Sequence, residues 1–254
     1  VEAIAVAAND EYALTPVLTQ AREKGISVIT LDADVEAGSR SIYISPVDAR
    51  ELGKELVREV DRICGHSGQW GILSAGSRSA NQNEWIYMMK QELQNLEYCG
   101  LRLVDIAYGE GEYEKAAEKA ELMLETYPDL KVMCCLSTEG IKAAADVVKA
   151  RGQASEVKVI GLGLPDQMEE YVGSDPEDVC PVLYIWSPMD LGRVAGYVCL
   201  ELSEGRIEER GDQELLLGGR TYPVDYGQDG GLEVIAGEPI RVDSENIGYW
   251  KDQI

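Results

Sequence analysis

The stretch Thr30-Leu31-Asp32-Ala33-Asp34 ends a short apolar run that reads as a β-strand, and two other stretches share this design. Ala80-Asn81-Gln82-Asn83-Glu84-Trp85 and Tyr184-Ile185-Trp186-Ser187-Pro188 also follow short apolar runs. Each puts carboxylate, amide or indole groups at the expected carboxyl end of a strand, where ligands bind in open α/β sheets. Together these groups suit a sugar-like ring, whose hydroxyls need donors and acceptors and whose C–H face needs an apolar plate.

Apolar runs that predict strands alternate with helical patterns along most of the chain. Helices are predicted from residue 48 to about 64 and over 138–151, and strands over 3–8 and 179–186. After Gly205 the pattern changes to glycine-rich, hairpin-like segments. This alternation predicts parallel sheets with helices on both faces. The strand over 3–8 is apolar at every position, which predicts burial on both sides.

The composition limits the classes of function. The 254 residues include 46 acidic and 23 basic ones, which gives a formal net charge of −23. That charge disfavours nucleic acids and anionic membranes as partners, and its simplest effect is a soluble surface. With 45% hydrophobic residues, the chain can bury a substantial core. No apolar run approaches the ~20 residues of a membrane-spanning helix.

The sequence gives little support for the common catalytic and cofactor-binding motifs. The six cysteines form no C-x-x-C pair and mostly occupy apolar positions, which favours buried thiols and leaves their disulfide state open. The only histidine, His66, lies in a turn signal and is a poor candidate for a Ser-His-Asp triad. Gly161-Leu162-Gly163 lacks the third glycine of a dinucleotide fingerprint. We therefore expect no catalytic residue, no metal site and no cofactor.

Asp32 and Asp34 leave one enzymatic alternative open. A pair of carboxylates at a strand end would suit glycoside hydrolysis, although such residues more often cap helices or solvate loops. Asn81 also suits a helix N-cap, and both Trp85 and Trp186 also suit a hydrophobic core. Turnover of a sugar would separate an enzyme from a binding protein.

The three stretches quoted first, together with other parts of the sequence, resemble a known protein family. Together with Ala5-Val6-Ala7-Ala8-Asn9-Asp10, Tyr127-Pro128-Asp129-Leu130 and Gly161-Leu162-Gly163-Leu164-Pro165, they resemble the type I periplasmic sugar-binding proteins of ABC transporters, most of all the rhamnose-binding and autoinducer-2-binding branch. The resemblance implies two α/β lobes, each a parallel sheet flanked by helices, joined by three crossings around a ligand cleft. It places lobe one at 1–45 plus about 187–230, and lobe two at 46–186 plus about 231–254.

The resemblance also implies which residues contact the ligand. Asp32 and Gln82 match the family's aspartate and glutamine, whereas Asn81 stands where the autoinducer-2 branch has Asp. Leu136 and Thr138 stand where that branch has Pro and Ala. These departures favour a rhamnose-like neutral monosaccharide over autoinducer-2. The expected ligand-binding residues are Asp32, Asn81, Gln82, Leu136, Thr138 and Trp186, the last stacking on the sugar ring.

The implied function is that of a non-enzymatic receptor. Such a protein delivers a small sugar to the membrane subunits of an ABC permease. It works in the periplasm, or outside the cell on a lipid anchor, after its signal peptide has been removed. Autoinducer-2 binding is the alternative within the class. The effector domain of a sugar-responsive transcriptional repressor, which shares the fold, is the alternative from another class.

The resemblance implies that the sequence begins after the family's first strand. We therefore expect lobe one to be incomplete, lacking the first two βα units, and the chain to be a fragment of a longer precursor. An open strand edge exposes unpaired N–H and C=O groups that can pair with another chain. We expect the open edge of the strand over 3–8 to be covered, either through self-association with another copy or by retained residues, and ligand affinity to be reduced.

Overall fold

The computed structural model describes residues 1–254, and the chain divides into two compact units. The backbone passes between them after Asp48, Ser77, Asn83, Ile185 and Glu238. The resemblance implies three such crossings. The two additional ones arise because the short segment at residues 78–83 is assigned to unit 1, between two segments of unit 2. Unit 1 consists of Val1–Asp48, Arg78–Asn83 and Trp186–Glu238, and unit 2 consists of Ala49–Ser77, Glu84–Ile185 and Pro239–Ile254.

Unit 1 is built on a six-stranded sheet in the order β1-β2-β3-β11-β10-β9. Strands β1, β2, β3 and β11 pair in parallel with their neighbours in this order. Strand β10 pairs antiparallel with both β11 and β9. Gly218 and Gly219, with φ of 57° and 86°, form the two-residue turn of the β9–β10 hairpin. The strands are β1 (Ala3–Val6), β2 (Ser27–Leu31), β3 (Ile42–Ser45), β9 (Gln213–Leu217), β10 (Arg220–Tyr226) and β11 (Leu232–Ile235).

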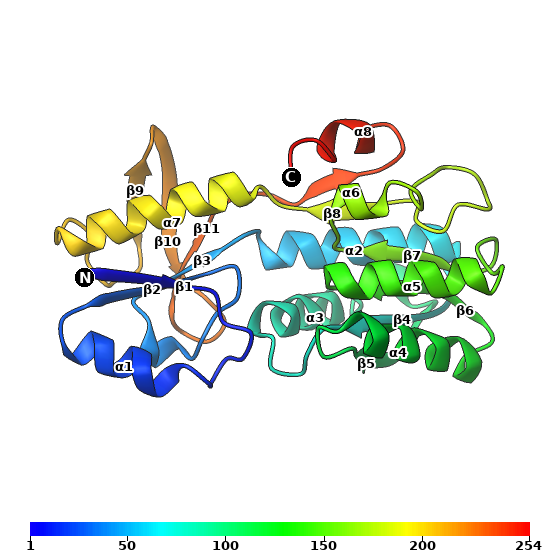
Figure 1. Cartoon of the computed structure of the whole chain (residues 1–254), viewed down its shortest axis with the longest axis horizontal. Helices are drawn as coiled ribbons and strands as arrows, with labels where there is room; N and C mark the ends of the chain where they lie inside the picture. The colour runs from blue at the N-terminus through cyan, green and yellow to red at the C-terminus, as the bar shows by residue number, and fades with distance from the viewer. The chain divides into compact units, whose positions relative to one another are not determined.

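Two helices cover opposite faces of this sheet, α1 (Thr15–Glu23) and α7 (Pro188–Ser203) (Figure 1). α7 begins with a cap: Ser187 Oγ accepts a hydrogen bond from the Asp190 N–H at 3.1 Å, and a proline occupies the first helical position. A short 3₁₀ helix, η1 (Ala37–Ser39), precedes β3. The core beneath α7 includes Ile29, Ile42, Val194, Val198 and Val234, and the core beneath α1 includes Ala8, Leu18, Val28 and Val35.

The late boundary of unit 1 lies beyond the expected position near residue 230. β11 alternates buried Leu232 and Val234 with partly buried residues, and it pairs in parallel with β3. Because this pairing completes the sheet of unit 1, the chain stays in that unit until Glu238.

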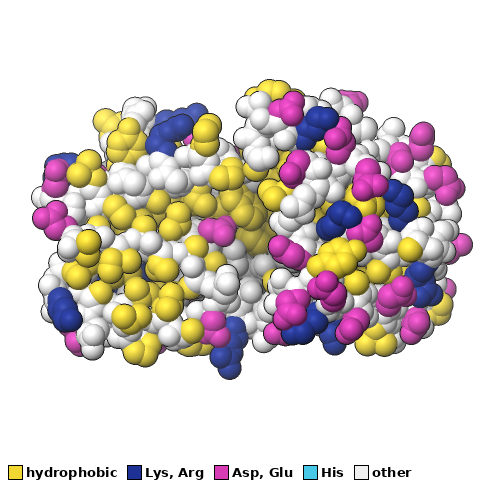
Figure 2. All heavy atoms as spheres, in the orientation of Figure 1, with side chains coloured by type: hydrophobic (Ala, Val, Ile, Leu, Met, Phe, Trp, Pro, Cys, Tyr) yellow, Lys and Arg dark blue, Asp and Glu magenta, His cyan; other side chains and the backbone are white.

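β1 is less buried than its apolar sequence suggests. It pairs only with β2, and none of its four residues is buried. It therefore forms one end of the sheet, and this open edge is the one on which the expectation of self-association rests. α7 contacts β1 and also exposes Met189, Tyr197 and Leu200. Figure 2 shows hydrophobic side chains gathered on the visible face of the part that carries these two elements.

Unit 2 contains a four-stranded parallel sheet in the order β5-β4-β6-β7. The strand expected over 179–186 is shorter: β8 pairs antiparallel with β12 in a separate two-stranded sheet. Pro181, which has no N–H to donate, precedes it. The strands are β4 (Gly68–Ser74), β5 (Leu101–Tyr108), β6 (Leu130–Cys135), β7 (Lys158–Gly161), β8 (Leu183–Ile185) and β12 (Ile240–Val242).

The helices of unit 2 follow the apolar spacing of the sequence. In α2 (Ala49–Cys64), Leu52, Leu56, Val60 and Cys64 recur every four residues and are buried. α3 (Ala80–Glu92) begins in the unit 1 segment and continues in unit 2. The remaining elements are η2 (Leu96–Tyr98), α4 (Tyr113–Thr126), α5 (Thr138–Ala150), α6 (Pro165–Met168) and α8 (Ile247–Trp250).

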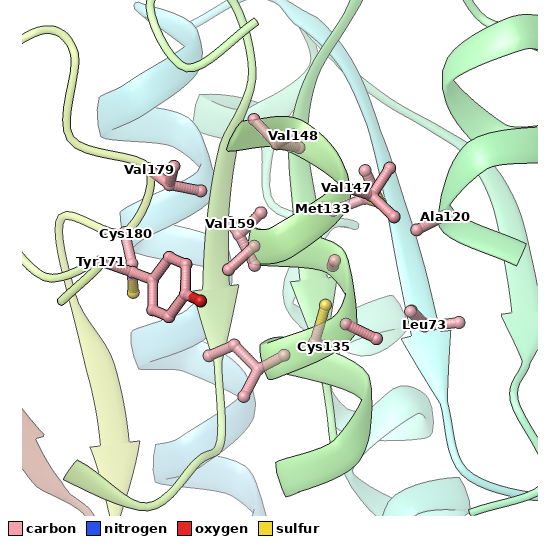
Figure 3. Close-up of a cluster of buried hydrophobic side chains, with 14 of the residues drawn as sticks. Leu73, Ala120, Met133, Cys135, Val147, Val148, Val159, Tyr171, Val179 and Cys180 are labelled. Carbon is pink, nitrogen blue, oxygen red and sulfur yellow. The ribbon is translucent and has the colours of Figure 1, made fainter. Parts of the chain in front are cut away.

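The core of unit 2 forms where α4 and α5 pack on the sheet. Figure 3 shows Leu73, Met133, Cys135 and Val159 of the strands facing helical residues such as Val147. All six cysteines are free thiols. The interpretation as buried hydrophobes is confirmed for Cys64, Cys134, Cys135 and Cys180, whereas Cys99 is exposed and Cys199 intermediate.

The surface agrees with the composition. Figure 2 shows Asp and Glu side chains on the visible face, more of them on unit 2 than on unit 1, in a chain with a net charge of −23. Among the helices, none has both the length and the apolar character needed to cross a membrane.

Candidate ligand-binding site

Asp32 lies at the centre of a tight turn at the end of β2. Its φ is 64°, in the left-handed region that non-glycine residues seldom adopt. The Ala33 N–H donates to the Leu31 carbonyl at 2.8 Å, which closes a three-residue γ-turn around Asp32. A residue held in this way costs roughly 1–3 kcal/mol, and such strain concentrates at functional sites.

Four backbone and side-chain contacts hold this turn. The Asp32 N–H donates to the Ile44 carbonyl at 3.2 Å, and the Ala8 N–H donates to the Ala33 carbonyl at 3.3 Å. The Asp32 carbonyl accepts two further bonds, from the Tyr43 hydroxyl at 2.8 Å and from Asn81 Nδ2 at 3.1 Å. All of these residues belong to unit 1, so the turn is fixed within one unit.

The Asp32 carboxylate has one unsatisfied oxygen. Its Oδ1 atom is buried and has no hydrogen-bond partner. Burial raises the pKa of Asp32 above its usual range, because desolvation penalises the charged form. A strained backbone and an unpartnered carboxylate oxygen in one residue make Asp32 the strongest candidate acceptor for a ligand's hydroxyl groups.

Asp34 has a different environment, although it is only two residues away. Its oxygens accept bonds from the Thr30 hydroxyl, the Val35 N–H and Arg40 Nε, the last two at 2.8 and 2.9 Å. Burial raises the pKa of Asp34, and the Arg40 guanidinium opposes that rise. Because these internal bonds occupy both oxygens, Asp34 is a structural anion and not the free partner of Asp32 that a glycosidase would need.

Arg40 is the buried counter-ion of this cluster, with its side chain 1% exposed. It also donates to the Leu232 carbonyl and bonds Asp229, both at 2.7 Å, and thereby ties the β2–β3 connection to the β10–β11 region. Its guanidinium carbon lies 5.6 Å from the centre of the Tyr43 ring. Arg40 and Tyr43 are not among the site residues expected from the sequence. Their only signal was a charged and an aromatic residue in an otherwise small or apolar run.

Asn81 and Gln82 are both buried in the first turn of α3. The Asn81 amide bonds the Asp32 carbonyl, and its Oδ1 accepts from the Gln82 N–H at 2.8 Å. The structure thus joins Asn81 to Asp32, and Gln82 follows Asn81 in the first turn of α3. The bonds made by Asn81 position the Asp32 turn, and its direct contact with a ligand stays a prediction.

The two tryptophans of the motif have different environments. Trp85 is 1% exposed and belongs to unit 2, so it is a core residue. Trp186 is the first residue of its unit 1 segment, precedes the α7 cap, and is partly buried where it packs against the unit 1 core. A stacking platform needs exposed ring surface, so the stacking role of Trp186 stays a prediction.

Leu136 and Thr138 belong to unit 2. Leu136 follows β6, is 2% exposed, and donates its N–H to the Leu73 carbonyl at 2.9 Å. Thr138 is the first residue of α5, just after Ser137, whose Oγ caps the helix by accepting from the Gly140 N–H at 3.1 Å. Both residues thus stand at the carboxyl end of a parallel strand, the end where ligands bind in such sheets.

The other motifs have structural explanations. Gly161 has φ of 134°, and a Cβ there would lie 1.8 Å from the Cys135 carbonyl oxygen, so backbone crowding explains this glycine. His66 Nδ1 lies 2.6 Å from Asp61 Oδ2 at the end of α2, with no serine of a triad among its bonded partners.

The chain is similar to known binding proteins in sequence and in fold. The periplasmic binding protein domain family matches residues 1–207. An ABC transporter solute-binding protein from Clostridium phytofermentas, solved with bound L-rhamnose, is 37% identical; the match covers 99% of this chain and 80% of that chain, with a TM-score of 0.95. LsrB from Clostridium saccharobutylicum, in complex with AI-2, is 17% identical over 98% of this chain and 81% of that chain, with a TM-score of 0.85, and shows the shared fold.

Among curated proteins, the D-ribose/D-allose-binding protein of Pseudomonas aeruginosa is 27% identical over 173 residues. The match covers 63% of this chain and 51% of that protein, so it spans about half the length of this curated relative. The family match, the 37% identity and the α/β fold agree with one another. The chain therefore belongs to the periplasmic binding protein family and resembles the solute-binding proteins of ABC transporters.

Proposed function

We propose that the protein is the receptor of an ABC importer and binds a rhamnose-like neutral monosaccharide, with Asp32 as the charged acceptor. The observation that carries this proposal is the buried, unpartnered Oδ1 of Asp32 in a strained turn. A carboxylate accepts two hydroxyl groups of a sugar through charge-assisted bonds, which are about twice as strong as neutral ones.

The relatives support the choice of sugar. The Clostridium phytofermentas protein, which binds L-rhamnose, is more similar in sequence than the AI-2-bound protein. Asn81 offers an amide donor, and this amide already bonds the Asp32 carbonyl. A carboxylate at position 81 would place two acceptors against each other there. For this reason, an autoinducer-2 site with aspartate at that position fits this turn less well.

The remaining residues have distinct roles in the proposal. Gln82 donates to and accepts from sugar hydroxyls, and Trp186 stacks on the C–H face of the ring. Leu136 and Thr138 are the proposed contacts from unit 2. The sugar is released unchanged to the permease subunits, and the protein works in the periplasm or at the outer cell surface, where its family typically acts.

Calorimetry of the protein with L-rhamnose, D-ribose, D-allose and autoinducer-2 tests the proposal. We expect L-rhamnose to bind most tightly and to be recovered unchanged, as followed by NMR. Ligand at about 100 times its dissociation constant should add ~2.7 kcal/mol to the free energy of unfolding. Tighter binding of autoinducer-2 than of any monosaccharide would overturn the choice of ligand, and release of a product would overturn the role as a receptor.

Two variants locate the site. Asp32→Ala should cost roughly 2–4 kcal/mol of sugar binding, since it removes the charge-assisted bonds and leaves the sugar's donors unpaired. Asp129→Asn is the matched control, because Asp129 is an exposed carboxylate in the turn before β6. Equal sugar affinity for Asp32→Ala and the control would remove Asp32 from the site.

A further inference from the structure

The direction of the Asp32 carboxylate depends on a backbone carbonyl. In the γ-turn around Asp32, two side-chain donors hold the carbonyl, the Tyr43 hydroxyl and the Asn81 amide. The positive φ of Asp32 persists only while the surroundings impose it. The donors of the carbonyl therefore affect where the carboxylate lies, because they hold the backbone of the turn.

Tyr43 is the more buried of the two donors. It is 4% exposed and lies on β3, which pairs in parallel with β2. The Arg40 guanidinium lies near its ring, and Arg40 is itself fixed by Asp34, Asp229 and the Leu232 carbonyl. The hydroxyl of Tyr43 is thus aimed at the turn by a chain of buried contacts that reaches β11.

We propose that Tyr43 is a positioning residue for sugar binding, which acts by holding the Asp32 carbonyl so that the carboxylate stays directed at the ligand. This inference rests on the proposed function of Asp32. Without the hydroxyl, only Asn81 bonds the carbonyl, and the turn relaxes toward an ordinary backbone conformation with negative φ. Relaxation rotates the carboxylate toward water, where its charge is better solvated.

The test begins with Tyr43→Phe, which removes the hydroxyl and keeps the buried ring. We expect L-rhamnose affinity, measured by calorimetry, to fall about tenfold, equivalent to ~1.4 kcal/mol. Tyr197→Phe is the matched control, because Tyr197 lies on the outer face of α7 and is partly exposed. Unchanged affinity in Tyr43→Phe, with wild-type protein binding the sugar, would overturn this inference and leave the proposed function standing.

A double-mutant cycle distinguishes positioning from direct contact. If Tyr43 acts through Asp32, its substitution should have almost no effect on affinity when Asp32→Asn is already present. An undiminished tenfold loss in that background would show that Tyr43 reaches the sugar directly, and would overturn the inference. Failure of the wild-type protein to bind any sugar would instead overturn the proposed function.

Titration of the Asp32 carboxyl group separates positioning from a simple loss of packing, which would leave the pKa of Asp32 unchanged. The carboxyl ¹³C shift of Asp32 in the free protein reports its pKa, which burial raises. In Tyr43→Phe we expect that pKa to return toward the usual range, because the carboxylate gains solvation. An unchanged titration curve would mean that the carboxylate has not moved, and would contradict the inference.

Discussion

Replacing Asp32 by Asn should stabilise the free protein while weakening its binding of sugar. The substitution keeps the shape of the side chain and removes a charge whose Oδ1 is buried without a partner. Relief of an unsatisfied buried polar atom is worth roughly 1–3 kcal/mol, and Asn also tolerates the left-handed φ of 64°. Because the neutral amide still leaves an oxygen unpaired, we expect a gain of about 1–2 kcal/mol.

The pH dependence of this gain follows from linkage. Burial raises the pKa of Asp32 above its unfolded value of about 4, so the folded protein holds that proton more tightly. The destabilising effect of the carboxylate is thus complete above the raised pKa and disappears as the pH falls below about 4. The stability difference between Asp32→Asn and wild type should be largest near pH 7 and should shrink on acidification.

Differential scanning calorimetry without and with L-rhamnose measures both effects. Free Asp32→Asn should melt ~2–8 °C above wild type at pH 7. Its sugar affinity should fall ~10- to 100-fold, since bonds to a charged acceptor contribute about 1.5–3 kcal/mol. A lower melting temperature for the free variant, with Asp129→Asn unchanged, would refute the view that the Asp32 carboxylate is a strained, unsatisfied group.

Three further outcomes test the packing of each unit. Arg40→Met should lower the free energy of unfolding by roughly 3–5 kcal/mol in urea titrations, because it leaves Asp34 buried without its cation; a loss below about 1 kcal/mol would contradict the assigned role. Ser137→Ala should cost ~1 kcal/mol in the same assay through loss of the α5 cap, and no change would remove that cap from the account. Iodoacetamide should modify Cys99 first in the folded protein, because Cys99 is exposed whereas burial raises the pKa of Cys134 to about 12. Mass spectrometry that shows Cys134 modified first would contradict the burial of Cys134.

The α/β alternation and the place of Asp32 follow from local sequence, because strand ends and helix starts are marked by nearby residues. The capped start of α7 is an example, with Ser187 and Pro188 adjacent in the chain. The pairing of β8 with β12 was not predictable in this way. It joins residues 183–185 to residues 240–242, and no local pattern encodes a partner so distant.

The candidate site also depends on contacts that local sequence does not predict. Asp32 and Asp34 look equivalent in sequence, yet Arg40 binds only Asp34, and Asp32 stays unpartnered at Oδ1. The Asp32 carbonyl accepts hydrogen bonds from Tyr43 and Asn81, which come from other elements. Likewise, Trp85 matched a sugar-binding motif but is core, because helix rotation and not residue type decides which side chain is buried.

The structure of the protein crystallised with L-rhamnose is the most direct test of the central claim. We predict that the Asp32 carboxylate accepts hydrogen bonds from two sugar hydroxyls, at about 2.5–2.7 Å, while Asp34 keeps its bonds to Arg40. A sugar bound at the site without contacting Asp32, or bound elsewhere with the Asp32 oxygen still unpartnered, would contradict the account.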